Sequence, residues 1–206
     1  GSTSVVLLDD VTCVQLQNQS PLGSTILPIF TGQTLYVLGN IITSSAGRSL
    51  HTTTPIKMIG TGSITTFSSN AELCCDIEIN TAGTITFVGS IFTNQNFKLK
   101  HTSGTVITAG STFTMGSNTT LDTNNTAMTF NTLTLNGTGT VLTLITDCRC
   151  NQFNMGVNNK TINGANIYNA GNLYAPSNTG NVQGTSKIIM NGTGTINAVG
   201  GAYFGI

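Results

Sequence analysis

Gly-Thr-Ile-Thr-Phe-Val-Gly-Ser-Ile-Phe-Thr at residues 83–93 is followed, after 21 residues, by Gly-Thr-Val-Ile-Thr-Ala-Gly-Ser-Thr-Phe-Thr at residues 104–114. Both copies contain Gly-Thr, then an aliphatic residue, then Gly-Ser-x-Phe-Thr. A period of about 20 to 25 residues is typical of one coil of a β-solenoid, in which successive coils stack to bury their apolar side chains. The repeat therefore predicts an all-β chain folded as a right-handed parallel β-helix.

The rest of the chain continues this rhythm without an exact repeat. Short runs that alternate Thr with apolar residues occur at 128–130 and 132–135, and Gly, Asn and Ser separate such runs at short intervals. Gly-Thr-Gly-Thr-Val at 137–141 returns as Gly-Thr-Gly-Thr-Ile at 192–196. Apolar residues nowhere keep the spacing of an amphipathic helix. Short strands of this kind are also compatible with a two-sheet β-sandwich, which is the alternative fold.

The domain organisation predicted from these patterns is one continuous unit with two regions. Residues 51–206 carry the regular strand signals and are assigned to the solenoid coils, and the chain is expected to contain about seven to nine coils. Residues 1–50 are less regular and contain Pro21 and Pro28, so they are expected to form an N-terminal cap or irregular strands. A solenoid needs such caps because an open end exposes unpaired backbone groups.

The composition excludes several functional classes. Charged residues make up 7% of the chain, against about 25% in ordinary domains, and the net charge is zero. Such a surface does not attract the nucleic-acid backbone, so nucleic acid is not an expected partner. The sequence contains no run of 18 apolar residues, so membrane insertion is not predicted. No phosphate-binding or dinucleotide motif is present, so no cofactor is predicted.

The five cysteines leave two interpretations open. Free cysteine is often a small apolar core residue, and alternate residues of a strand share a face, so Cys148 and Cys150 should point the same way. The alternative is a disulfide or a metal site, although zinc sites more usually show Cys-x-x-Cys spacing. The first interpretation is preferred, and no metal site is predicted. The five are Cys13, Cys74, Cys75, Cys148 and Cys150.

Catalysis has weak support in the sequence. Enzymes that cleave polysaccharides use clustered carboxylates, and Glu72, Asp76 and Glu78 are the candidate group. No recognised nucleophile or metalloprotease motif accompanies them. The chain is therefore predicted not to be an enzyme, with a polysaccharide-processing β-helix enzyme as the alternative.

The best local candidate for a ligand contact is a sugar site around two tyrosines. Tyr168 and Tyr174 lie close together in the sequence, and Asn166 and Asn172 beside them could form hydrogen bonds to sugar hydroxyls. Aromatic rings with nearby amides are the combination that glycan recognition requires. The competing interpretation is that both rings pack against the solenoid.

Repeated threonine suggests a second kind of surface. Thr-x-Thr occurs at 84–86, 112–114, 132–134 and 138–140, and such pairs on a flat face could order water in an ice-like lattice. The pairs do not keep a constant register along the sequence, and Thr also suits the outside of any strand. Ice binding is therefore kept as a further alternative.

The Gly-Thr-aliphatic-Thr repeats with Asn and Gly at the corners resemble the parallel β-helices of viral and phage fibres and of secreted bacterial adhesins. The resemblance covers residues from about 80 to 200 and contains no signature motif. It implies a homo-oligomer such as a trimeric fibre, a location on a virion or an extracellular or cell surface, and attachment to host-surface glycans or to other virion proteins. The expected function is thus a non-enzymatic structural or attachment solenoid.

Overall fold

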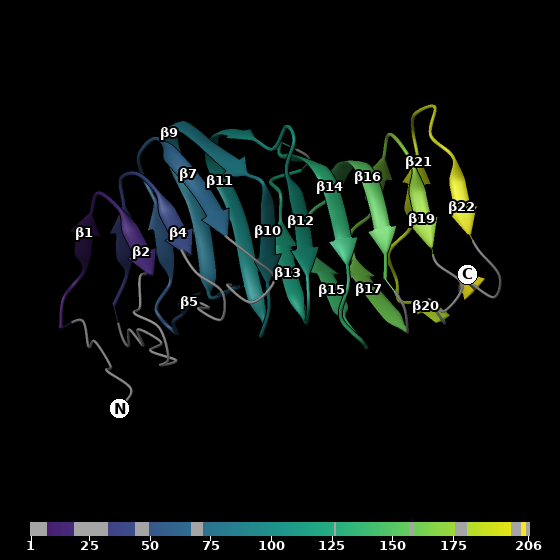
Figure 1. The fold of residues 1–206 in the computed structure, drawn as a ribbon, viewed down its shortest axis with the longest axis horizontal. Helices are drawn as coiled ribbons and strands as arrows, with labels where there is room; N and C mark the ends of the chain where they lie inside the picture. Colours follow the sequence, from purple (N-terminus) through teal and green to yellow (C-terminus); the bar gives the residue numbers. More distant parts are fainter. Residues whose placement is uncertain are drawn as a thin grey trace.

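The chain is a β-solenoid whose parallel strands stack in about seven turns (Figure 1). The computed structural model describes residues 8–18, 33–43, 50–66, 72–125, 127–156, 159–175, 181–198 and 203–204. Within these ranges all the regular secondary structure is β-strand. The described residues contain no helix that is long and apolar enough to span a membrane. The sandwich alternative is wrong, because a sandwich is built from antiparallel strands and every described ladder here is parallel.

Each coil contributes strand segments to three faces, which we call the first, second and third faces in chain order. The first face contains β1 (Val11–Cys13), β3 (Leu35–Val37), β6 (Ile56–Met58), the beginnings of β9 (Asp76–Val88) and β11 (Phe97–Ile107), β13 (Thr119–Asp122), β15 (Val141–Leu144), β17 (Lys160–Gly164), β20 (Asn181–Gln183) and β23 (Tyr203–Phe204). The second face contains β2 (Leu16–Asn18), β4 (Ile41–Thr43), β7 (Gly62–Thr66), the ends of β9 and β11, the beginnings of β14 (Thr129–Leu135) and β16 (Cys148–Met155), β18 (Ile167–Asn169) and β21 (Ile188–Met190). The third face contains β5 (Leu50–His51), β8 (Leu73–Cys74), β10 (Ser90–Thr93), β12 (Thr112–Met115), the ends of β14 and β16, β19 (Leu173–Ala175) and β22 (Ile196–Ala198).

The stacking register sets the length of a coil. On the first face Leu35 pairs with Ile56 and Ile56 with Ile77, and all three side chains are buried. Elsewhere the offset between paired residues varies from 19 residues, between Cys148 and Ile167, to 25, between Leu16 and Ile41. Strands β1 to β4 join these ladders, so the described part of residues 1–50 belongs to the same stack. Residues 19–32, with both prolines, lie outside the described residues.

The repeat that predicts the fold contains a one-residue shift. Thr84 pairs with Thr105 as the 21-residue period requires, but Ile91 pairs with Phe113, an offset of 22. The additional residue is Ser111, whose backbone N–H and hydroxyl both donate to the Thr108 carbonyl at 2.9 and 2.6 Å. A one-residue shift exchanges the two sides of a strand. Phe113 is consequently buried, whereas Phe92, its counterpart in the sequence repeat, faces outward.

The similarity between residues 137–141 and 192–196 also has no counterpart in the stack. Val141 begins β15 on the first face, whereas Ile196 begins β22 on the third face. The shared Gly-Thr-Gly-Thr sequence therefore marks two turns at different corners, since any corner of a coil favours these residues.

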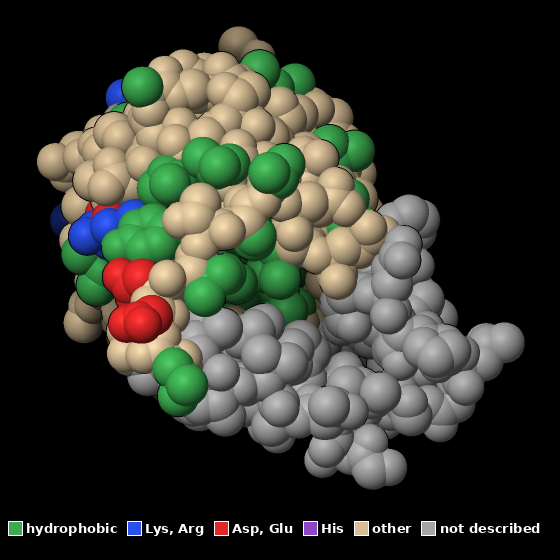
Figure 2. Space-filling model, turned by 90° about the vertical axis from the view of Figure 1, so that its left-hand side faces the viewer, with side chains coloured by type: hydrophobic (Ala, Val, Ile, Leu, Met, Phe, Trp, Pro, Cys, Tyr) green, Lys and Arg blue, Asp and Glu red, His purple; other side chains and the backbone are tan. Residues whose placement is uncertain are grey.

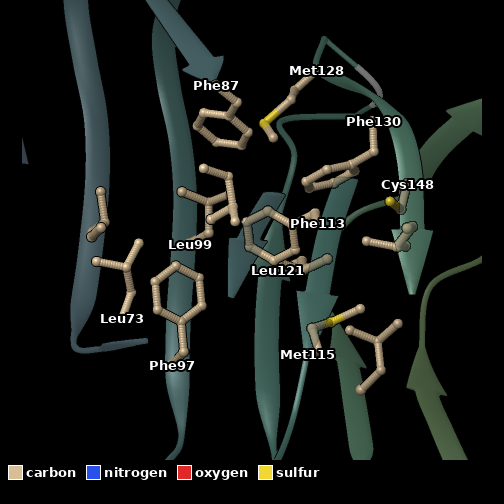
Figure 3. Packing of buried hydrophobic residues seen from close by; sticks show 14 of the residues in the cluster. Leu73, Phe87, Phe97, Leu99, Phe113, Met115, Leu121, Met128, Phe130 and Cys148 are labelled. Atoms are coloured by element: carbon tan, nitrogen blue, oxygen red, sulfur yellow. The ribbon is translucent and has the colours of Figure 1, made fainter. Parts of the chain in front are cut away.

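The core is a continuous column of apolar side chains with phenylalanines at its centre (Figure 3). Phe113 of the third face lies between Phe97 of the first face and Phe87 and Phe130 of the second. The ring centroids are 5.8 Å apart for Phe97, 5.9 Å for Phe87 and 5.1 Å for Phe130. Aromatic pairs in this range add stability beyond the area that they bury. Phe113 therefore links all three faces.

The cysteines belong to this core, as the preferred interpretation predicted. Cys148 and Cys150 both point inward from β16, and Cys74 and Cys75 are also buried. None of the five cysteines forms a disulfide bond, and Cys13 is half-buried. Burial raises the pKa of Cys150 to about 12, so its thiol stays protonated and unreactive. Among the described residues no three His, Cys, Asp or Glu side chains are grouped as a metal site would require.

Candidate binding face

Charged side chains gather on the outer surface of the first face. Lys57, Glu78, Lys100 and Asp122 occupy paired positions on β6, β9, β11 and β13, so their signs alternate from coil to coil. Lys57 lies 3.2 Å and Lys100 3.6 Å from the Glu78 carboxylate. Viewed from the end of the solenoid, basic and acidic side chains lie together on one side (Figure 2). This arrangement is a neutral ladder of ion pairs.

The same ladder bears on the enzyme alternative. Glu72 precedes β8, and its carboxylate accepts a hydrogen bond from the Asn94 amide at 2.9 Å, whereas Asp76 and Glu78 lie on β9. Burial acts to raise the pKa of Glu78, but the Thr102 hydroxyl and the ammonium groups of Lys57 and Lys100 outweigh it and hold the pKa below its usual value. A carboxylic acid that protonates a leaving group needs a raised pKa. The environment of Glu78 lowers its pKa, whereas a catalytic acid would need a raised pKa.

We expect Glu78→Gln to reduce the acid sensitivity of the fold. Because the folded-state pKa of Glu78 is lowered, its carboxylate stabilises the fold above the unfolded pKa, and this stabilisation is lost as the pH falls through the folded pKa. Urea unfolding should show that E78Q loses less free energy of unfolding than the wild type between about pH 5 and about pH 2, by up to about 1 kcal/mol. High salt should reduce the difference, since it screens the ion pairs. Equal losses in both proteins would contradict the role given to Glu78.

The outer surface of the third face has a different chemistry. Strands β10, β12, β14, β16, β19 and β22 lie next to one another (Figure 1). Each of them presents two outward side chains, one of which belongs to the residue directly before the strand in the case of β19 and β22. These side chains form two rows that run along the solenoid axis from β10 to β22, and over this length neither row contains a charged residue. Before β10 the second row continues to Glu72, because Thr93 pairs with Leu73. The first row is Ser90, Thr112, Thr132, Gln152, Asn172 and Thr195, and the second row is Phe92, Thr114, Thr134, Asn154, Tyr174 and Asn197.

The C-terminal part of the two rows surrounds a shallow hollow of about 270 Å³. Its amides are partly organised by bonds between neighbours: the Gln152 amide donates to the Asn154 carbonyl at 2.9 Å, and the Asn172 carbonyl accepts from the Thr195 hydroxyl at 3.1 Å. The Tyr174 side of the hollow is open, with 41% of that residue exposed. The hollow therefore combines fixed amides and hydroxyls with an accessible aromatic ring. It is lined by Gln152, Asn154, Asn172, Leu173, Tyr174, Thr195 and Asn197.

The structure separates the four residues predicted to contact a glycan. Asn172 and Tyr174 line the hollow on the third face, but Tyr168 lies on β18 of the second face and lines another depression with Arg149 and Asn191. Asn166 is a corner residue: its backbone N–H donates to the Asp147 carboxylate at 2.9 Å, and its side-chain carbonyl accepts from the Lys187 N–H at 3.2 Å. One pair thus shares a site, and the other pair does not join it.

The other five residues that line the hollow were not predicted from the sequence. Leu173 lies between the two predicted residues, whereas the remaining four come from the coils before and after Tyr174, about one coil length away in the chain: Gln152, Asn154, Thr195 and Asn197. The signal that could have identified them is the stacking register, because Gln-Phe-Asn at 152–154 and Asn-Leu-Tyr at 172–174 have the same outward-inward-outward pattern.

The threonine pairs form a shorter array than ice binding requires. Thr112 and Thr114 stack directly on Thr132 and Thr134, but the next coil has Gln152 at the corresponding position. The pair at 84–86 lies on the second face, and the pair at 138–140 lies in the turn before β15. Ice binding stays a prediction with two stacked Thr-x-Thr coils in its favour.

No protein-family model, no curated protein and no solved structure matches this chain. The assignment of a function therefore depends on the geometry and chemistry of its faces.

Proposed function

We propose that the protein is a non-enzymatic attachment element of a virion or cell surface, which binds its target through the third face. The observation that carries the proposal is the segregation of charge: from β10 to β22 the two outward rows of the third face contain no charged side chain, whereas the first face has alternating ion pairs. Backbone hydrogen bonds between coils hold the rows at fixed spacing. The third face is thus a preformed surface that is free of strongly hydrated charges.

A non-catalytic role is supported by the positions of the carboxylates. Asp76 and Glu78 are engaged with lysines on the first face, and Glu72 accepts a hydrogen bond from the Asn94 amide. Between β10 and β22 neither row of the third face supplies an acid or a base. Binding at the third face therefore has hydrogen-bonding and aromatic groups available to it, but no acid–base pair for hydrolysis.

Self-association is part of the proposal and concerns another surface. Val88 and Ile107 are exposed apolar side chains at the ends of β9 and β11, on the second face. They are available to a second copy while the third face stays accessible. Light scattering coupled to size exclusion measures the oligomeric state, and a trimer is the expected result.

A pair of matched threonine variants tests the attachment role. Thr134 on the third face and Thr143 on the first face both point outward from the middle of a stack and are half-buried. Binding of fluorescent protein to a panel of intact animal, bacterial and algal cells should fall about tenfold or more in Thr134→Lys, as for loss of an interface centre, and should persist in Thr143→Lys.

Three outcomes would overturn this function. They are an absence of binding to every surface in the panel, equal binding by the two variants, and thermal hysteresis of the wild type that Thr134→Lys removes. The last outcome would assign the stacked threonines to ice.

A further inference from the structure

We propose that the ligand of the third face is a neutral polysaccharide that lies along the solenoid axis, with its best-held sugar at Tyr174. This inference rests on the attachment role of the third face and adds the chemical class and direction of the ligand. It follows from three features: the uncharged rows, the aromatic residues at two points along them, and the shallow form of the hollow.

The first feature selects a ligand without charge. An acidic polysaccharide is recognised by Arg and Lys, and the two outward rows contain neither between β10 and β22. Amides and hydroxyls both donate and accept hydrogen bonds, as sugar hydroxyls do. The Asn197 side chain lines the hollow and makes no hydrogen bond with the described residues, so both ends of its amide are available to a ligand.

The second feature gives the direction. Phe92 and Tyr174 occupy the same outward row, and Thr114, Thr134 and Asn154 lie between them. Four strand-to-strand steps at about 4.8 Å place the two aromatic residues about 19 Å apart along the axis. Each ring offers an apolar surface for the C–H side of a sugar ring, and the polar residues between them face the hydroxyls of the intervening sugars. A ligand that uses both rings must be an extended chain parallel to the axis.

The third feature favours a polymer over a small sugar. Sites that enclose a small ligand usually have volumes of about 300 to 1,000 Å³ and bury most of its surface. The hollow of about 270 Å³ is open and lies on a nearly flat face, so one sugar would make few contacts there. A chain collects weak contacts from several coils at once, because once its first sugar is bound the following sugars are held at high effective concentration.

The test uses purified polysaccharides and defined oligosaccharides with three aromatic variants. Isothermal titration against dextran, mannan, xyloglucan and mixed-linkage glucan is compared with heparin and alginate. We expect binding to at least one neutral chain, which Tyr174→Ala weakens about tenfold or more, as for an aromatic at the centre of an interface. Phe92→Ala should weaken binding of oligosaccharides long enough to reach both rings while leaving disaccharide binding unchanged. Tyr168→Ala, on the second face, is the matched control and should bind like the wild type.

Outcomes that contradict the inference are distinct from those that contradict the attachment role. Binding confined to the acidic polymers, equal effects of Tyr174→Ala and Tyr168→Ala, or an affinity independent of chain length would overturn it. No binding to any polysaccharide, together with Thr134-dependent binding to cells, would reject the polysaccharide and leave the attachment role intact. Absence of cell binding would reject both. Asn197→Ala, at an exposed side chain that makes no hydrogen bond with the described residues, provides a second binding variant if Tyr174→Ala does not fold.

Discussion

Replacing Phe113 by Ala is expected to lower the free energy of unfolding by about 3 to 5 kcal/mol, the range for a fully buried phenylalanine. Its ring contacts Phe87, Phe97 and Phe130, which come from the other two faces (Figure 3). Truncation removes all of these contacts, and the backbone ladders of β10, β12 and β14 prevent the coil from collapsing into the cavity. The cost should therefore lie in the upper part of this range. Chemical denaturation followed by circular dichroism measures it.

Phe92→Ala is the matched control for this prediction. Phe92 lies on the neighbouring strand β10 but points outward from the third face, so its loss should cost about 1 kcal/mol or less. The two phenylalanines have the same place in the sequence repeat, and only the stacking register distinguishes them. Equal destabilisation by the two substitutions would contradict the stacking register between β10 and β12. A small effect of Phe113→Ala would contradict the packing of its ring against Phe87, Phe97 and Phe130.

This pair also shows how much of the fold the sequence predicts. The solenoid, its coil length and the inward direction of Ile85 and Phe87 follow from the repeat and from alternation. The side of the strand on which Phe113 lies does not follow, because the best sequence alignment keeps a period of 21 where the structure inserts Ser111. One residue in a turn changes the similarity of two segments very little, yet it inverts every side chain of the following strand.

The candidate site was predictable only in part for a related reason. Alternation identifies Tyr168 and Tyr174 as outward residues, but it cannot show that the chain turns a corner between them at Ala170 and Gly171. The two tyrosines therefore lie on different faces although they are only six positions apart in the chain. Gln152, by contrast, is 22 residues from Tyr174 and lies in the same hollow. In a solenoid, proximity across coils depends on turn lengths, which local patterns do not specify.

The glycines of one turn give the second prediction with a large expected effect. Gly137-Thr138-Gly139 lies in the turn between β14 and β15. The sequence pattern alone does not show which of the two positions requires glycine. A Cβ atom on Gly137 would overlap the backbone carbonyl of Gly116 in the preceding coil, and it would also lie 2.8 Å from the Thr140 hydroxyl oxygen. At Gly139 nothing lies within 4 Å, and its φ of 64° is a conformation that Asn adopts readily. The close approach of two coils, rather than backbone freedom, is what requires glycine at 137.

We therefore expect Gly137→Asn to lower the free energy of unfolding by about 3 kcal/mol or more, and Gly139→Asn to change it by less than about 0.5 kcal/mol. The coil cannot easily move away from the new side chain. The Gly137 carbonyl accepts hydrogen bonds from the Thr140 hydroxyl and the Lys160 ammonium group, each at 2.6 Å, and Gly116 is held by its N–H bond to the Thr93 carbonyl at 2.8 Å. Separating the coils would weaken these bonds and leave the buried Lys160 amine less well solvated. Urea unfolding of the two variants measures the difference, and because both introduce the same side chain into the same turn, differences in residue type cancel. Similar stabilities would mean that the coils at Gly116 and Gly137 do not approach as closely as the ladder between β12 and β14 requires.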